Sequence, residues 1–129
     1  MNSKLKKMNT KTKNIIFWVL TGLVAFVFLG SAYGKITGNP EGLKMAENFG
    51  LNTISFKLLG FIELAAIVLF IIPRTGVIGT LLLVAYMGGG IATHLEHGQS
   101  VIAPIVISAF VWIVGMLRFP EFSTRILGK

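Results

Sequence analysis

The chain has 129 residues, no cysteine and a formal net charge of +7; 53% of its residues are hydrophobic and only 13% are charged. Soluble domains carry about a quarter charged residues, so this composition, with a mean hydropathy of +0.77, indicates an integral membrane protein. The missing cysteines exclude disulfides, thiolate metal sites and CxxC redox relays. The positive charge does not indicate nucleic-acid binding, because five of the twelve Lys and Arg residues precede the first apolar segment.

Four apolar segments predict an all-α membrane protein, an antiparallel four-transmembrane-helix bundle that forms a single domain over residues 1–129. Each segment is near the lower end of the length that crosses a hydrocarbon core of about 30 Å. The first is longer than the apolar part of a cleavable signal peptide, so we expect a retained helix. Short connections make helices adjacent in sequence antiparallel neighbours. The predicted spans are about 15–33, 54–72, 77–93 and 101–117.

The basic residues predict the orientation of the chain in the membrane. The lysine-rich N-terminus, residues 1–14, is typical of a cytoplasmic segment facing lipid head groups. Four spans return the C-terminus to the same side, which leaves only Lys35, Lys44 and Lys57 outside. We therefore expect both termini to be cytoplasmic.

The connection between the first two spans, residues 37–51, predicts a short interfacial helix. Asn39 can cap it, Pro40 suits its first position and Gly50 suits its end. Its apolar residues would give it one apolar side that lies on the outer interface.

The later connections carry turn and stop signals. Pro73-Arg74-Thr75-Gly76 predicts a tight turn between the second and third spans. Arg118-Phe119-Pro120 ends the fourth span, because proline breaks a helix. The apolar residues that follow predict an interfacial tail whose arginines reach towards water: Phe119, Phe122, Ile126 and Leu127.

Small residues predict where helices touch, because close backbone approach drives helix association in lipid. Gly30 and Gly34 form a small-xxx-small pair, and the third span contains Gly88, Gly89 and Gly90 in succession. We expect helix packing at these five positions. The alternative is that the three adjacent glycines leave room for a ligand or a hinge.

Glu63 lies at the midpoint of the second apolar segment. A charged group there costs roughly 2.5–3.5 kcal/mol on insertion, which makes such residues functional candidates. At 1.5 Å per residue Glu63 would lie about 13 Å below the outer end, near the depth of Tyr86. We expect Glu63 and Tyr86, with Lys35 and His94 at the rim, to line one outward-opening cavity as ligand-binding or proton-site candidates. Further candidates for its walls are Ser31, Tyr33, Ser108 and Trp112.

Each candidate also has a structural interpretation. Glu63 can be a neutral acid that bonds another helix, whereas with a Lys or His partner it would be charged. Lys35 can be an interfacial anchor and Tyr86 a packing aromatic. His94 and His97 are spaced as metal ligands on a helix, but a third ligand is missing and the helix should end there. We therefore predict no metal site, and no catalytic residue stands out.

Four stretches together resemble the DoxX-like family, over roughly residues 26–125. They are Gly30-Ser31-Ala32-Tyr33-Gly34-Lys35, Gly60-Phe61-Ile62-Glu63-Leu64, Pro73-Arg74-Thr75-Gly76, and Tyr86-Met87-Gly88-Gly89-Gly90-Ile91-Ala92-Thr93-His94. The resemblance implies a four-helix protein of the bacterial cytoplasmic (inner) membrane, with the family's recurring Lys and Glu at Lys35 and Glu63. The family is named after proteins similar to a thiosulfate:quinone oxidoreductase subunit, and some members associate with oxidative-stress enzymes.

Three functional hypotheses follow. In the first, the chain is a membrane subunit or accessory factor with a polar intramembrane cavity for a quinone-like or other lipid-soluble molecule. Its partners would be the lipid bilayer, a membrane-associated oxidoreductase and other copies in a homo-oligomer. No flavin, haem or iron–sulfur motif is present, so we expect neither a bound cofactor beyond a quinone nor an autonomous enzyme. The alternatives are a proton-coupled small-molecule transporter that uses Glu63, and a structural interaction protein without a ligand.

Overall fold

The computed structural model describes residues 9–128, and over these residues it contains helices and no strand. The lysines at positions 4, 6, 7 and 129, which enter the predicted charge distribution, lie outside the described residues. The elements are α2 (Thr10–Thr37), α3 (Pro40–Asn48), α4 (Thr53–Ile71), the 3₁₀ helix η1 (Pro73–Thr75), α5 (Gly76–Glu96), α6 (Ile102–Arg118) and α7 (Pro120–Leu127).

Among the described residues, three helices are long and apolar enough to cross a membrane: α2, α4 and α5 with η1. Helices α6 and α7 meet the same test only as a pair, and the pair is bent by 111°. By length and composition, the described residues therefore contain three candidate spans, or four if the bent pair counts as one. An all-helical, multi-pass membrane architecture is confirmed, and the four-span arrangement in the bilayer stays a prediction.

The first long helix extends beyond the apolar segment that predicted it. The Asn9 side chain accepts a hydrogen bond of 2.7 Å from the Thr12 amide and so caps the start of α2. Gly38, with φ +65°, ends the helix in the left-handed conformation that glycine tolerates. Polar caps therefore decide the length of α2, and the apolar segment alone does not.

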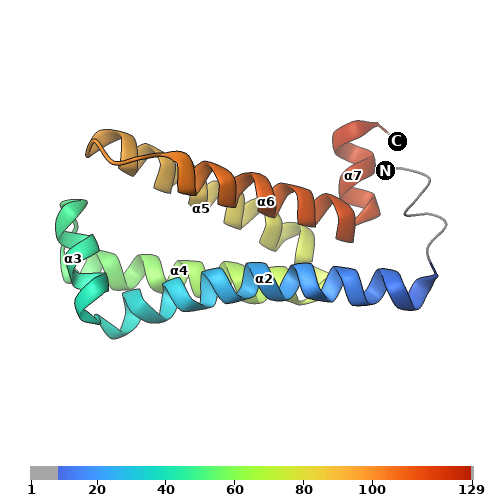
Figure 1. Ribbon diagram of the computed structural model, residues 1–129, viewed down its shortest axis with the longest axis horizontal. Helices are drawn as coiled ribbons and strands as arrows, with labels where there is room; N and C mark the ends of the chain where they lie inside the picture. The colour runs from blue at the N-terminus through green and yellow to red at the C-terminus, as the bar shows by residue number, and fades with distance from the viewer. Residues whose placement is uncertain (1–8, 129) are drawn as a thin grey trace.

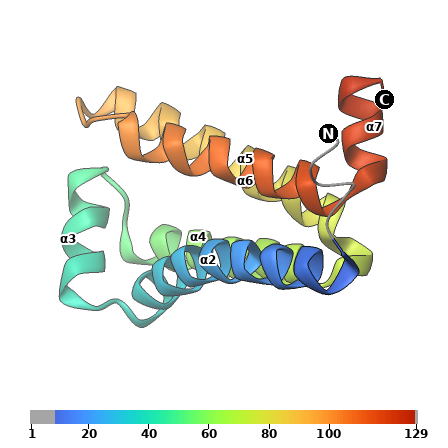
Figure 2. The ribbon, with the colours of Figure 1, turned by 45° about the vertical axis from the view of Figure 1, so that its right-hand side comes forward.

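The long helices pack in sequence order, α2 on α4, α4 on α5 and α5 on α6, whereas α2 and α6 contact each other little. The start of α2, η1 and α7 lie at one end of the molecule, called here the α7 end (Figure 1). Helix α3 and the α5–α6 connection lie at the opposite end, the α3 end. The pair α5 and α6 diverges from the pair α2 and α4 towards the α3 end, as both views show (Figure 2).

Tight packing towards the α7 end depends on two glycines. A Cβ atom at Gly79 would lie 2.2 Å from the Phe70 backbone nitrogen, so α4 and α5 touch through their backbones. A Cβ at Gly115 would lie 2.6 Å from Thr80 Cγ2, so α6 packs directly against the Thr80 side chain of α5. Large buried side chains, including Ile67 and Leu83, fill the space between the helices.

Arg118 joins the end of α6 to the end of α4. Its guanidinium donates to the Phe70 carbonyl (2.8 Å) and the Ile71 carbonyl (3.2 Å). The last carbonyls of a helix have no partner within the helix, so Arg118 satisfies two groups that would otherwise be open. The guanidinium also lies over the rings of Trp18, Phe70 and Phe119.

The chain turns sharply after Arg118, as the sequence predicted, but the tail packs differently. Phe119 and Phe122 are 5% and 6% exposed, so these two side chains face the protein and not a membrane interface. Phe122 stacks on Trp112, with ring centroids 5.4 Å apart. Ile126 and Leu127 are about half exposed, so only this part of α7 keeps an apolar surface.

The predicted helix between the first two spans is present as α3. The Asn39 side chain accepts a hydrogen bond of 2.7 Å from the Gly42 amide, Pro40 begins the helix, and Gly50 has φ +66°. Residue 42 must be small, because a Cβ there would lie 2.7 Å from the Gly34 carbonyl oxygen. The position of α3 at a membrane interface stays a prediction.

The glycines expected at helix contacts do not pack against another long helix of the described chain. A Cβ at Gly30, Gly88, Gly89 or Gly90 would meet no described atom within 4 Å. A Cβ at Gly34 would meet only the side chain of Asn39, in the turn that follows α2. These positions therefore make no close contact with another span in the described chain, because the helix pairs diverge where most of them lie.

Candidate functional site

Glu63 lies inside the protein, on the face of α4 that is turned towards α2 and α5. Its side chain is almost fully buried, and the residue is 2% exposed. A carboxylate in such a place needs partners, because an isolated buried charge costs far more free energy than the helix can recover. Among the described residues, no buried side-chain nitrogen or oxygen lacks a hydrogen-bond partner.

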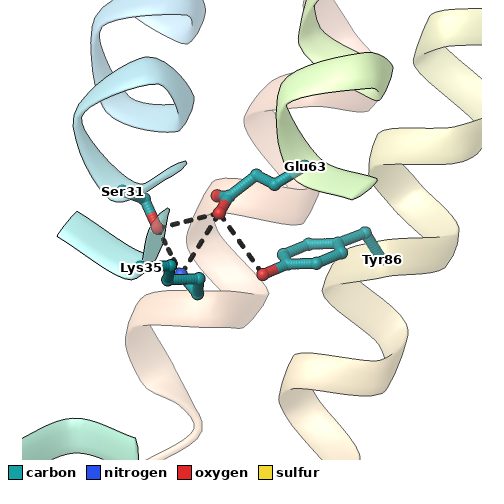
Figure 3. A network of polar contacts seen from close by, with 4 residues as sticks. All are labelled: Ser31, Lys35, Glu63 and Tyr86. Carbon is teal, nitrogen blue, oxygen red and sulfur yellow. Dashed lines mark hydrogen bonds and ion pairs between the residues drawn. The ribbon is translucent and has the colours of Figure 1, made fainter. Parts of the chain in front are cut away.

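Two residues of α2 supply the first partners. Lys35 Nζ lies 3.2 Å from Glu63 Oε1 and forms an ion pair with it. Ser31 Oγ donates to the same Oε1 at 3.1 Å and accepts a short hydrogen bond from Lys35 Nζ. Ser31 and Lys35 are four residues apart, so both side chains lie on the same face of α2 (Figure 3).

Tyr86 of α5 supplies the third partner. Its hydroxyl donates to Glu63 Oε1 at 3.3 Å (Figure 3). Three long helices therefore converge on one carboxylate oxygen. We call Ser31, Lys35, Glu63 and Tyr86 the polar cluster.

The close approach of α2 and α4 makes the ion pair possible. Gly60 lies one turn before Glu63 on the same side of α4, and a Cβ there would lie 2.9 Å from both Lys35 Cβ and Ile36 Cγ1. Any larger residue would push the helices apart and lengthen the contact between Lys35 and Glu63. The ring of Phe56, 5.5 Å from Lys35 Nζ, covers the ammonium group from the α4 side.

A cavity of about 470 Å³ lies beside the polar cluster. Its walls come from α2, α3, α4, α5, α6 and the residues after α3, and they are mainly apolar. Glycines without near neighbours, Gly89 and Gly90, line it on α5, so the absence of side chains there leaves space. Two glycines of the run therefore border open space in the described chain.

His94 lines the cavity near the α3 end but does not join the polar cluster. Its Nδ1 lies 2.7 Å from the Gly90 carbonyl oxygen of its own helix, and its ring lies 4.8 Å from the ring of Phe49. Phe49 also approaches His97, with ring centroids 6.0 Å apart. Phe49, in the segment after α3, therefore contacts the end of α5 beside the cavity. No group of three or more potential metal ligands occurs among the described residues.

The structure brings together Glu63, Lys35 and Tyr86, which the sequence singled out, and Ser31 joins them as a further partner of the Glu63 carboxylate. The other suggested wall residues do not line the cavity: Tyr33 is 68% exposed, Trp112 stacks on Phe122, and Ser108 lies elsewhere on α6. Sequence reasoning missed Phe56 and Gly60. The spacing of Gly60 and Glu63, one helical turn apart, was the signal that could have revealed the close approach.

Membrane-length helices around a buried ion pair and a cavity define a multi-pass membrane protein with a buried polar cluster. The chain belongs to the DoxX-like family, whose family model matches residues 19–114. The matched region contains all four residues of the polar cluster. Comparison with curated proteins and with solved structures gave no match.

Proposed function

We propose that the chain is a membrane subunit or accessory factor whose cavity binds a quinone-like, lipid-soluble molecule. One observation carries the proposal: a mainly apolar cavity of about 470 Å³ is bordered by a buried ion pair and a tyrosine. Ligand sites typically have about 300–1,000 Å³ and a few polar groups in an apolar wall. The apolar walls would hold a ring and the start of a tail, and the polar cluster would orient a polar head.

The proposed role is binding and orientation, and electrons would come from a partner. The sequence offers no flavin, haem or iron–sulfur motif, so a membrane-associated oxidoreductase would carry out the redox step. Glu63 would accept a hydrogen bond from the ligand, and Lys35 and Tyr86 would hold the carboxylate in place. His94 and Phe49 would border the ligand at the α3 end.

The proposed topology is an antiparallel bundle of four spans in a bacterial cytoplasmic membrane, with α6 and the start of α7 as the fourth. Lys35, Lys44 and Lys57 belong to the elements near the α3 end, whereas those near the α7 end carry five positive residues, Lys11, Lys13, Arg74, Arg118 and Arg125. Positive residues favour the cytoplasmic side, so the α7 end would face the cytoplasm and α3 would lie on the outer interface.

Proton-coupled transport by the same cluster would require access from both sides of the membrane. The cavity borders α3. Towards the α7 end, buried apolar side chains such as Phe70 and Leu83 fill the space between the described helices. Among the described residues the cluster is open towards the α3 end, so transport would need a second arrangement of the helices that opens the α7 end.

The test is mass spectrometry of small molecules that copurify with the protein in lipid nanodiscs. Gly89→Leu places a side chain in the cavity, whereas Gly22→Leu adds one at an exposed position of α2 that has no near neighbour. We expect wild type and Gly22→Leu to retain a lipid-soluble molecule and Gly89→Leu to lose it. The proposal fails if wild type retains none and if added quinones and quinols leave its thermal midpoint unchanged.

A further inference from the structure

The partners of Glu63 are distributed unevenly between its two oxygens. Ser31, Lys35 and Tyr86 all contact Oε1, and none of the described residues bonds Oε2 (Figure 3). Every side-chain oxygen that is fully buried in the described protein has a hydrogen-bond partner. Because Oε2 has no such partner, it is not fully buried and keeps some contact with open space. Glu63 lines the cavity, and that cavity is therefore the space that Oε2 meets.

Lys35 has little capacity left for a ligand. Its ammonium group has three N–H bonds. One points to Ser31 Oγ, one to Glu63 Oε1, and the ring of Phe56 lies 5.5 Å away on another side. At most one N–H remains for the cavity.

Tyr86 offers the cavity an acceptor. Its only proton is donated to Glu63, so the hydroxyl oxygen can only accept from a further partner. Acceptors in the wall, Glu63 Oε2 and Tyr86 Oη, thus outnumber the single remaining donor of Lys35. The formal charges of Lys35 and Glu63 sum to zero, which gives no reason for the site to attract a charged ligand.

We infer that the cavity selects a neutral amphiphile whose head donates a hydrogen bond, such as a phenol or a hydroquinone, over its carbonyl-only counterpart. This inference rests on the proposed function and specifies the ligand class for the same site. A hydroxyl can donate to Glu63 Oε2 and accept from Lys35 at the same time. A carbonyl can only accept, and its lone pairs would face an anionic oxygen that stays without a partner.

Three ligands with the same decyl tail test the preference: a decyl-substituted hydroquinone, the matching benzoquinone and the hydroquinone dimethyl ether. Binding to the full chain in detergent micelles is measured by calorimetric titration, with the hydroquinone kept reduced under nitrogen. Hydrogen bonds to charged groups correspond to roughly tenfold or more in affinity. We expect the hydroquinone to bind at least about tenfold more tightly than the other two ligands.

The outcomes separate this inference from the proposed function. Equal binding of the three ligands, or tighter binding of the benzoquinone, overturns the preference and leaves a lipid-binding cavity. If none of the three binds to wild type, the proposed function fails and the preference with it.

Glu63→Gln links the preference to the carboxylate. The amide keeps the shape of the side chain but removes the anionic acceptor, so the hydroquinone preference should fall to about threefold or less. Glu47→Gln changes an exposed glutamate of α3 that lies outside the cavity and should leave the preference unchanged. If Glu63→Gln does not fold, the electrically balanced variant Lys35→Met/Glu63→Gln takes its place. Retention of the full preference in the folded variant contradicts the inference.

Discussion

A single carboxylate oxygen organises the centre of this protein. Lys35, Ser31 and Tyr86 reach Glu63 Oε1 from two other helices, and each contact offsets part of the cost of moving the charge out of water. Removing one member of a buried ion pair leaves its partner uncompensated, which is costlier than removing both. The cluster therefore couples α2, α4 and α5 through charge as well as through packing.

Lys35→Met should destabilise the protein by about 3 kcal/mol, because Glu63 loses its counter-ion in a buried setting. The double variant Lys35→Met/Glu63→Gln should recover at least half of that loss. Lys57→Met, at an exposed position of α4, serves as the control and should have little effect. Unfolding in detergent, followed by circular dichroism, gives the free energies of unfolding of these variants and of Glu63→Gln alone. Strict additivity of the two single changes would show that the pair is not coupled.

The sequence could predict the depth of the cluster residues but not the rotation of each helix. Depth follows from residue count: it placed Glu63 and Tyr86 at one level and Lys35 at the rim, whereas in the structure Lys35 reaches Glu63 directly. Rotation separates Tyr33 from Ser31 by about 200° around α2, so the two cannot face the same cavity. Tyr33 accordingly points outward, whereas Ser31 reaches Glu63.

At the scale of helices, glycine position matters more than the small-xxx-small pattern. The pattern favoured Gly88, Gly89 and Gly90, yet a Cβ there meets nothing nearby in the described chain. The close contacts are at Gly60, Gly79 and others that the pattern did not single out. Sequence spacing marks where two helices are able to approach, but tertiary packing decides where they do so.

Alanine substitutions at two glycines of α5 should therefore have opposite effects. Gly79→Ala forces a Cβ against the backbone of Phe70 and should cost at least about 2 kcal/mol. Gly88→Ala meets no described atom and should gain up to about 1 kcal/mol from helix propensity. Thermal unfolding in the same detergent compares them. Loss of stability in Gly88→Ala would contradict an open face at this position and would indicate contact with another copy of the chain.

The sequence placed Arg118 in the stop signal after the fourth span, and in the structure its side chain also caps α4. Arg118→Ala should cost about 1.5–3 kcal/mol, because the carbonyls of Phe70 and Ile71 lose a charged donor. Arg125→Ala is the matched control, at an exposed position of α7. Hydrogen exchange at the end of α4 reports the local effect. Equal exchange in the two variants would mean that the cap does not hold the helix end.

For the whole molecule, composition and the order of motifs were sufficient to predict a helical membrane protein of the DoxX-like family, and the family match confirms it. They could not predict the cavity, since its volume depends on how far two helix pairs diverge. Nor could they reveal that the ring of Phe49, after α3, contacts the ring of His94 beside that cavity. Such features arise from packing between elements distant in sequence.

The proposed four-span topology can be tested with single cysteines, because the native chain has none. Gln99→Cys lies after α5 and Thr124→Cys lies in α7. A membrane-impermeant maleimide should label Gln99→Cys in intact cells and Thr124→Cys only after the cells are opened. The cysteine-free parent controls for background labelling. Labelling of both positions in intact cells would rule out the bent α6–α7 pair as a crossing.

The zero sum of charge at Lys35 and Glu63 has a consequence for how the protein responds to membrane voltage. A single charge that moves across the full field gains or loses about 2.3 kcal/mol per 100 mV, whereas a compensated pair gains almost nothing. Ligand occupancy should therefore be the same in energised and de-energised vesicles. A ligand with a cationic head would instead carry a charge partway through the electric field to reach the site, so its occupancy should depend on the potential.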